Sequence, residues 1–140
     1  MGLLERLFRK TPKRNKEEGT SLVRYKNSFF HAIEGFVYCV RYEHNMIIII
    51  IATIIVTILG LILKISSSEW LFIVAICGGI TACEMINSSI EATIDLCTKE
   101  IHPLAKIAKD TASAATLILC MTSLIGGIII FLPKIITLFQ

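Results

Sequence analysis

Five polar side chains stand at helical spacing at the end of a long apolar segment. They are Glu84, Asn87, Ser88, Glu91 and Asp95. Because residues three, four, seven and eleven positions apart share one face of an α-helix, they form a stripe about 16 Å long. An acidic residue inside a membrane costs about 2.5 to 3.5 kcal/mol and usually faces a protein interior, water or a bound ion. The stripe predicts a functional site, and it fits a proton path and a metal site equally well.

A second group of charged residues follows within residues 100–113. Pro103 is typical of the first turn of a helix, and that helix would align four polar residues on one face. These residues are Lys106, Lys109, Asp110 and Ser113. Lysines beside acidic groups at a membrane interface suit phosphate binding, but lysines at a helix end also commonly extend toward water without a ligand. The spacing alone fits both interpretations.

Three apolar runs accompany these clusters, at about residues 46–63, 70–90 and 114–132. Each is close to the roughly 20 residues that cross a bilayer as a helix. With 54% hydrophobic residues among 140, the chain is too apolar for an ordinary soluble domain. The sequence therefore predicts an all-α integral membrane protein with three transmembrane helices, the first of them facing lipid.

The positive charges predict the orientation in the membrane. Nine Lys and Arg residues precede the first apolar run, one follows it, three lie between the second and third, and one follows the third. Because positive residues concentrate on the cytoplasmic side, we expect the N-terminus and the loop at residues 95–113 in the cytoplasm and the C-terminus outside. The stripe would then open toward the side that holds nucleotide and magnesium.

The N-terminal region divides into two parts. Residues 1–21 read as a flexible basic tail that contacts anionic lipid headgroups, and residues 22–42 as an amphipathic helix on the membrane surface. Residues 22–140 are expected to form a single membrane domain. Nucleic acid is not an expected partner, because aromatic residues are not interleaved with the basic ones. The five cysteines include no CxxC pair and are interpreted as packing residues.

The two polar clusters together contain the minimal parts for phosphoryl transfer to a lipid hydroxyl. Carboxylates can hold magnesium, and a lysine can neutralise phosphate charge. The sequence has no GxxxxGK[ST] loop, no GxGxxG loop and no His-Arg-Asp motif. A kinase built from these residues would belong to neither of the two common classes.

One sequence pattern is more specific. The run Glu84-x-x-Asn87-x-x-x-Glu91-x-x-x-Asp95, followed by His102 and by Ala108-Lys109-Asp110, resembles the signature of the small prokaryotic diacylglycerol kinase and undecaprenol kinase family. The similarity extends back through Glu43, Gly35 and Arg24 and covers about residues 22–132. His102-Pro103 is more similar to the Gram-positive undecaprenol kinase branch.

This resemblance implies a homotrimer of three-span subunits in the bacterial plasma membrane, with active sites shared at the cytoplasmic interface. It implies phosphorylation of a lipid hydroxyl with ATP as co-substrate and Mg²⁺ as cofactor. The expected product is undecaprenyl phosphate, made from undecaprenol. Diacylglycerol, which would give phosphatidic acid, is the alternative acceptor.

The resemblance also implies a role for each matching residue. Glu84 would be the general base, and Glu43 and Glu91 would bind the magnesium ion. The nucleotide would contact Arg24, Glu43, Glu91, Asp95, Glu100, His102, Lys109 and Asp110. The lipid would contact Arg24, Glu84, Asn87 and Ser113.

Two other classes of function remain open from the residues alone. The stripe could relay protons or cations, but this needs polar residues on the outer side, where the sequence offers little beyond Lys64, Glu69 and the serines between them. The chain could also be a structural membrane subunit, which leaves the cost of the acidic stripe without an explanation.

Overall fold

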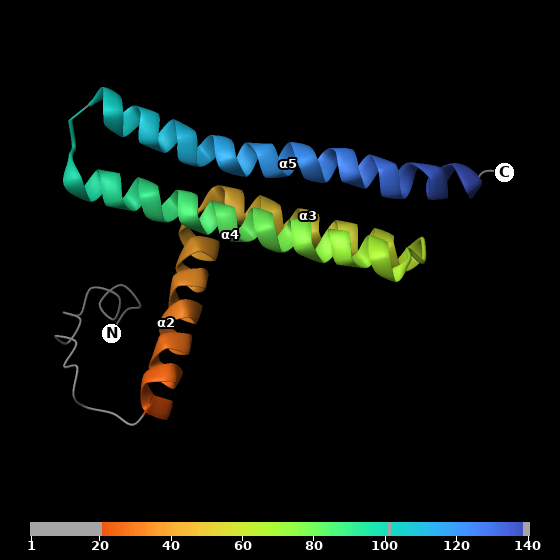
Figure 1. The fold of residues 1–140 in the computed structure, drawn as a ribbon, viewed down its shortest axis with the longest axis horizontal. Coiled ribbons are helices and arrows are strands. Elements are labelled where there is room, and N and C mark those ends of the chain that lie inside the picture. The colour runs from red at the N-terminus through yellow and green to blue at the C-terminus, as the bar shows by residue number, and fades with distance from the viewer. Residues whose placement is uncertain (1–20, 101, 139–140) are drawn as a thin grey trace. The chain divides into compact units, whose positions relative to one another are not determined.

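The computed structural model describes residues 21–100 and 102–138, and these residues form four α-helices (Figure 1). They are α2 (Ser21–Tyr42), α3 (His44–Ile62), α4 (Ser67–Cys97) and α5 (Pro103–Thr137). The all-α prediction is confirmed. The chain divides into two compact units, residues 1–35 and 36–140. Apart from Ser21, with which α2 begins, the predicted tail at residues 1–21 lies outside the described residues.

Three of the helices, α3, α4 and α5, are long and apolar enough to cross a membrane, which confirms a multi-pass membrane protein. Both α4 and α5 continue past the apolar runs that predicted them. Helix α4 continues to Cys97, and α5 begins at Pro103, well before the run at residues 114–132. A helix needs apolar residues only where it meets lipid, so hydropathy marks the embedded part of each helix and not its full length.

The starts of α4 and α5 follow from local sequence. At α4, Ser66 and Glu69 form a capping box in which each side chain accepts the other residue's backbone N–H. At α5, Pro103 occupies the first turn, and Nδ1 of His102 accepts the backbone N–H of Leu104 at 3.2 Å. These caps satisfy N–H groups that a helix start leaves without partners and so fix where each helix begins.

Helices α4 and α5 run antiparallel and side by side (Figure 1). An acid–lysine pair joins them near each end of α4. Lys109 Nζ lies 2.5 Å from Asp95 Oδ1, and Lys134 Nζ lies 3.2 Å from Glu69 Oε2. These two pairs fix the register of α5 against α4.

Helix α3 packs on α4, and close to the turn at residues 63–66 Gly60 of α3 lies against the ring of Trp70 of α4. Lys64 adopts a positive φ of 48°, which reverses the chain in this short connection. Ile65, Ile73, Ile130 and Phe131 form a buried apolar cluster at this end, and α3 approaches it with the side chain of Val56. Most large side chains of α3 are exposed, as expected for a helix that faces lipid.

The described part of the first unit, residues 21–35, is the start of α2. It carries exposed apolar side chains, among them Leu22, Tyr25 and Phe29. His31 Nδ1 and Glu34 Oε2 lie 3.1 Å apart on the same stretch. Mixed apolar and charged residues at helical spacing are typical of a membrane-surface helix, and that role for α2 stays a prediction.

Candidate active site

The polar stripe on α4 passes from buried to exposed along the helix. Glu84 is 2% exposed, and Asn87 and Ser88 are also buried. Glu91 is half-buried, and the side chain of Asp95 is 66% exposed. One helix face therefore carries a carboxylate out of water at one end and a carboxylate in water at the other. Helix geometry separates Glu84 from Glu91 by about 10 Å along the axis.

Two hydrogen bonds order the buried part of the stripe. Asn87 Nδ2 donates to Glu91 Oε1 at 3.0 Å, and Ser88 Oγ donates to the backbone oxygen of Glu84 at 3.0 Å. Among the described residues Oδ1 of Asn87 has no partner, although it is buried. A buried polar atom without a hydrogen bond costs about 1 to 3 kcal/mol, so this oxygen is suited to accept a hydrogen bond from a ligand.

The junction between α2 and α3 brings Glu43 and Cys39 to the same region. Glu43 is the N-cap residue of α3, and its side chain makes no capping hydrogen bond within the described part of the chain. The Glu43 carboxylate is thus available to bind a ligand or a metal ion. Burial raises the pKa of the Cys39 thiol above its ordinary value, and the negative charge of Glu43, followed by that of Glu84, adds to the rise. The thiol therefore lies within electrostatic range of both carboxylates.

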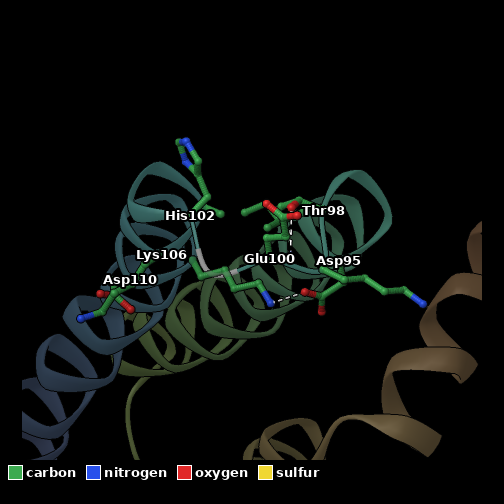
Figure 2. Close-up of a pocket in the computed structure, with 10 residues that line it drawn as sticks. Asp95, Thr98, Glu100, His102, Lys106 and Asp110 are labelled. Carbon is green, nitrogen blue, oxygen red and sulfur yellow. Dashed lines mark hydrogen bonds and ion pairs between the residues drawn. The ribbon is translucent and has the colours of Figure 1, made fainter.

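A pocket of about 510 Å³ lies where α4 ends and α5 begins (Figure 2). Asp95 and Thr98 line it from the end of α4, Glu100 and His102 from the connection, and Lys106 from α5. The complete lining is Ile94, Asp95, Thr98, Lys99, Glu100, His102, Ala105, Lys106, Lys109 and Asp110. Basic, acidic and imidazole side chains that surround an open volume are suited to a charged, polar ligand.

Three hydrogen bonds fix five of these residues. Lys109 Nζ donates to Asp95 Oδ1, and the backbone N–H of Glu100 donates to Thr98 Oγ1 at 3.1 Å. Nδ1 of His102 accepts from the α5 backbone. An imidazole that accepts at Nδ1 carries its proton on Nε2 when neutral, which leaves an N–H donor for a ligand.

The structure brings most of the predicted residues into two groups. Five predicted nucleotide contacts line the pocket: Asp95, Glu100, His102, Lys109 and Asp110. Glu84, Asn87 and Glu91 follow one another on α4. Ser113 is exposed on α5, and Arg24 is exposed on the part of α2 that belongs to the first unit.

The residues predicted for magnesium fit that ion in their chemistry. No cluster of three or more His, Cys, Asp and Glu side chains suited to a metal occurs in residues 21–100 and 102–138. Mg²⁺ usually takes only one or two protein carboxylates, together with phosphate oxygens and water. The unused carboxylate of Glu43 and the half-buried carboxylate of Glu91 are donors of this kind.

An apolar groove of about 190 Å³ lies beyond the buried end of the stripe, and Ile80, the α4 residue of its lining that is nearest to the stripe, precedes Glu84 by one helical turn. All three spanning helices line it, and nearly all of its lining is apolar. Representative residues are Ile49 and Val56 of α3, Ile73 and Ile80 of α4, and Phe131 of α5. Such a groove is suited to a hydrocarbon chain and not to a charged group.

Sequence reasoning missed several residues of this region. Thr98 and Lys99 line the pocket, but in sequence they look like ordinary residues of a polar connection. Cys39, which the sequence predicts to be a packing residue, is buried, but it also lies within electrostatic range of Glu43 and Glu84. Thr116 is buried on α5 without a hydrogen-bond partner among the described residues. Only the register of α5 against α4 could have pointed to it.

This arrangement can support a proton transfer at its buried end and the binding of a charged phosphate compound at its exposed end. A carboxylate beside an apolar groove can accept a proton from a membrane-embedded group. Lysines with neighbouring carboxylates can hold a phosphate and its metal ion. Helix α4 carries residues of both regions, so it links the proton-accepting carboxylate to the charged pocket.

Comparison with known proteins identifies a protein family that matches this chain. The family model described as "Prokaryotic diacylglycerol kinase" matches residues 30–131, which include all of α3 and α4. The match covers both polar clusters and the connection between them.

Individual relatives agree with this match. Undecaprenol kinase of Bacillus subtilis strain 168 is 39% identical over 121 residues, which cover 86% of this chain and 98% of that protein. Diacylglycerol kinase of Pseudomonas aeruginosa strain PAO1 is 33% identical over 96 residues, covering 69% and 78%. Diacylglycerol kinase of Helicobacter pylori strain 26695 is 50% identical over 60 residues, covering 42% and 47%. With a family model that matches most of its length, this chain belongs to the prokaryotic diacylglycerol kinase family.

Proposed function

We propose that this lipid kinase transfers the γ-phosphoryl group of magnesium-bound ATP to the hydroxyl of undecaprenol. One observation carries the proposal: the stripe on α4 runs from a carboxylate that is 2% exposed, Glu84, to the charged pocket at Asp95 and Lys109. A buried base one helical turn from an apolar groove suits a lipid alcohol. A pocket with lysines and carboxylates suits a nucleotide triphosphate.

In the proposed reaction Glu84 is the general base. Its carboxylate takes the proton from the alcohol as the alcohol oxygen forms a bond to the γ-phosphorus. The bond between that phosphorus and the β,γ-bridging oxygen breaks, and ADP leaves with the electron pair. Asn87, which holds Glu91 through its Nδ2 atom, lies one turn nearer the pocket and orients the reacting groups.

Glu43 and Glu91 are the proposed magnesium ligands, and Mg²⁺ would neutralise negative charge on the β- and γ-phosphates. Lys109, with Asp95 and Asp110, would contact the phosphates. Glu100 and His102 would contact the ribose and adenine from the connection.

The remaining predicted contacts come from α2 and α5. Arg24 would meet both the phosphates and the lipid headgroup, and Ser113 would contact the headgroup. Both side chains are exposed and so accessible to a ligand at the membrane surface.

The choice of undecaprenol depends on the relatives. The relative named undecaprenol kinase matches over nearly its full length, and the shared segments include both polar clusters. Diacylglycerol is the second candidate acceptor, because the family model and the Pseudomonas relative carry that name. The apolar groove would hold part of the hydrocarbon chain in either case.

We propose the following setting in the membrane. The N-terminus and the pocket face the cytoplasm, as the excess of Lys and Arg favours. Helix α2 lies on the membrane surface through its exposed apolar side chains. Three copies of the chain associate, and a neighbouring subunit covers Glu91 and Asp95, which a single chain leaves partly exposed.

The test uses purified protein in detergent with MgATP and either lipid. We expect lipid phosphorylation, faster with undecaprenol than with diacylglycerol, and its loss in Glu84→Gln. Glu69→Gln, which changes the acid at the other end of α4, is the matched control and should keep the wild-type rate. An undiminished rate in Glu84→Gln would reject the assigned base. Proton flux into liposomes without ATP would instead favour a conducting protein.

A further inference from the structure

Six threonine side chains inside the described helices share one arrangement. Their hydroxyl groups donate to the backbone oxygen four residues earlier, at 2.7 to 2.9 Å, as seen for Thr53, Thr57, Thr81, Thr93, Thr111 and Thr122. This bond satisfies the hydroxyl within its own helix. Thr116 of α5 differs, because its Oγ1 has no partner among the described residues although the side chain is only 9% exposed.

The register between α4 and α5 places Thr116 at the level of the stripe. Counting seven residues along α5 from Lys109 and seven back along α4 from its partner Asp95 pairs Thr116 with Ser88. The pair Lys134 and Glu69 provides a second count from the other end. Eighteen residues back along α5 from Lys134 and eighteen residues forward along α4 from Glu69 place Thr116 opposite Asn87. The ion pairs at both ends of the two helices therefore place Thr116 at the height of Asn87 and Ser88 along α4.

This level lies between the proposed base and the proposed metal ligand. Residue 88 follows Glu84 by about 6 Å along the helix axis and precedes Glu91 by about 4.5 Å. Thr116 also shares a face of α5 with Lys109, seven residues earlier, which contacts α4 directly. The hydroxyl of Thr116 is thus on the face of α5 that meets the stripe.

Two buried polar atoms at one level lack partners within the described residues: Oγ1 of Thr116 and Oδ1 of Asn87. The amide oxygen can only accept a hydrogen bond, whereas the hydroxyl can donate and accept. A phosphoryl oxygen without a proton offers nothing to Asn87 Oδ1. An alcohol matches both atoms, because it can donate to the amide oxygen and accept from the threonine hydroxyl.

We infer that Thr116 binds the hydroxyl of the lipid alcohol, donating a hydrogen bond to the oxygen that will attack phosphorus. This inference rests on the proposed function and adds a residue of α5 to it. Asn87 Oδ1 accepts a hydrogen bond from the alcohol O–H until the proton of that O–H passes to Glu84. As negative charge develops on the alcohol oxygen, the donated hydrogen bond becomes stronger.

The test replaces the hydroxyl without changing the shape of the side chain. In Thr116→Val we expect kcat/KM for the lipid alcohol at saturating MgATP to fall about tenfold, the effect of one lost hydrogen bond. The KM for MgATP should stay unchanged. Thr116→Ser keeps a hydroxyl and should retain most of the activity.

The same variant should also be more stable without ligands. Replacing an unpartnered buried hydroxyl by a methyl group removes a desolvation cost, so the thermal midpoint of ligand-free Thr116→Val should rise above that of the wild type. A residue that only supports the fold would not combine higher stability with lower activity. Thr116→Ala repeats the kinetic test if the valine variant folds poorly.

Thr122→Val is the matched control, because the Thr122 hydroxyl already donates to Ile118 in its own helix at 2.9 Å. It should keep wild-type kinetics. Unchanged kcat/KM for the alcohol in Thr116→Val, as expected if these atoms hold only a buried water, would overturn the inference. An equal loss in MgATP binding would do the same. A wild-type chain that phosphorylates no lipid alcohol would instead reject the proposed function itself.

Discussion

Two acid–lysine pairs join α4 to α5 at opposite ends, and their surroundings differ. Glu69 Oε2 accepts from Lys134 and also from the backbone N–H and the hydroxyl of Ser66. Asp95 Oδ1 accepts from Lys109, and its side chain is 66% exposed beside a pocket of about 510 Å³. The first carboxylate completes a helix cap, whereas the second faces open volume. An ion pair alone does not mark a functional site; the volume and the other charges around it do.

The largest expected difference between the two ends is in activity. Lys109→Met should lower kcat/KM for MgATP about 100-fold, because it removes a positive charge from the proposed phosphate site. Lys134→Met should leave kcat/KM within about twofold, because its partly buried pair with Glu69 lies at the opposite end of α4 from the proposed site. Steady-state rates of both variants with the same lipid measure the contrast. Equal losses of kcat/KM in the two variants would contradict the assignment of a phosphate site to the Asp95–Lys109 pair alone.

At the Glu69 end of the helix pair, a change in side-chain packing should instead lower the stability of the protein. A Cβ at Gly126 would overlap the ring of Phe72, so Gly126→Ala should lower the free energy of unfolding by about 1 to 3 kcal/mol. Nothing among the described atoms lies within 4 Å of a Cβ built at Gly127, which makes Gly127→Ala the control. Denaturant unfolding in detergent compares the two. A Gly126→Ala protein as stable as Gly127→Ala would contradict the packing described here.

The smallest effect concerns the thiol near the stripe. Because burial raises the pKa of Cys39, its thiolate should form only at higher pH than in an unfolded chain. Any stability from the neutral thiol is complete below its ordinary pKa and is lost as pH rises through the raised value. A chain that keeps only Cys39 should react with iodoacetamide about tenfold more slowly at pH 8.5 than one that keeps only the exposed Cys97.

The reaction profile against pH provides the check on this prediction. The alkylation rate of Cys39 should still be rising at a pH where an ordinary thiol has reached its plateau. Equal rates and equal midpoints in the folded and denatured forms of the Cys39 chain would show that neither burial nor the nearby carboxylates raise the pKa of this thiol.

Much of the fold follows directly from the sequence. Apolar runs of sufficient length predict α3, α4 and α5, because the bilayer imposes both the length and the composition of a spanning helix. The stripe from Glu84 to Asp95 is equally visible, since its members lie on a single helix and need only the helical period. Predictions within one helix require no knowledge of tertiary contacts.

What sequence reasoning could not provide were contacts between helices. Asp95 and Lys109 are each visible as charged residues, but their pairing depends on how the short connection brings α5 back along α4. Thr116 looks like one more residue of an apolar helix until its level opposite Asn87 is known. Cys39 is similar, because its position near Glu84 depends on how the junction before α3 folds.

Helix α4 extends without a break from Ser67 to Cys97, a rod of about 46 Å at 1.5 Å per residue. The proposed base and the proposed metal ligand both lie on this rod, seven residues apart. Because the helix is continuous, we expect their separation to stay constant through the proposed reaction, unlike that in kinases whose lobes close over the nucleotide. In the proposed reaction the nucleotide would therefore reach Glu91 from water, while the alcohol would reach Glu84, about 10 Å away along the helix, by lateral diffusion within the bilayer.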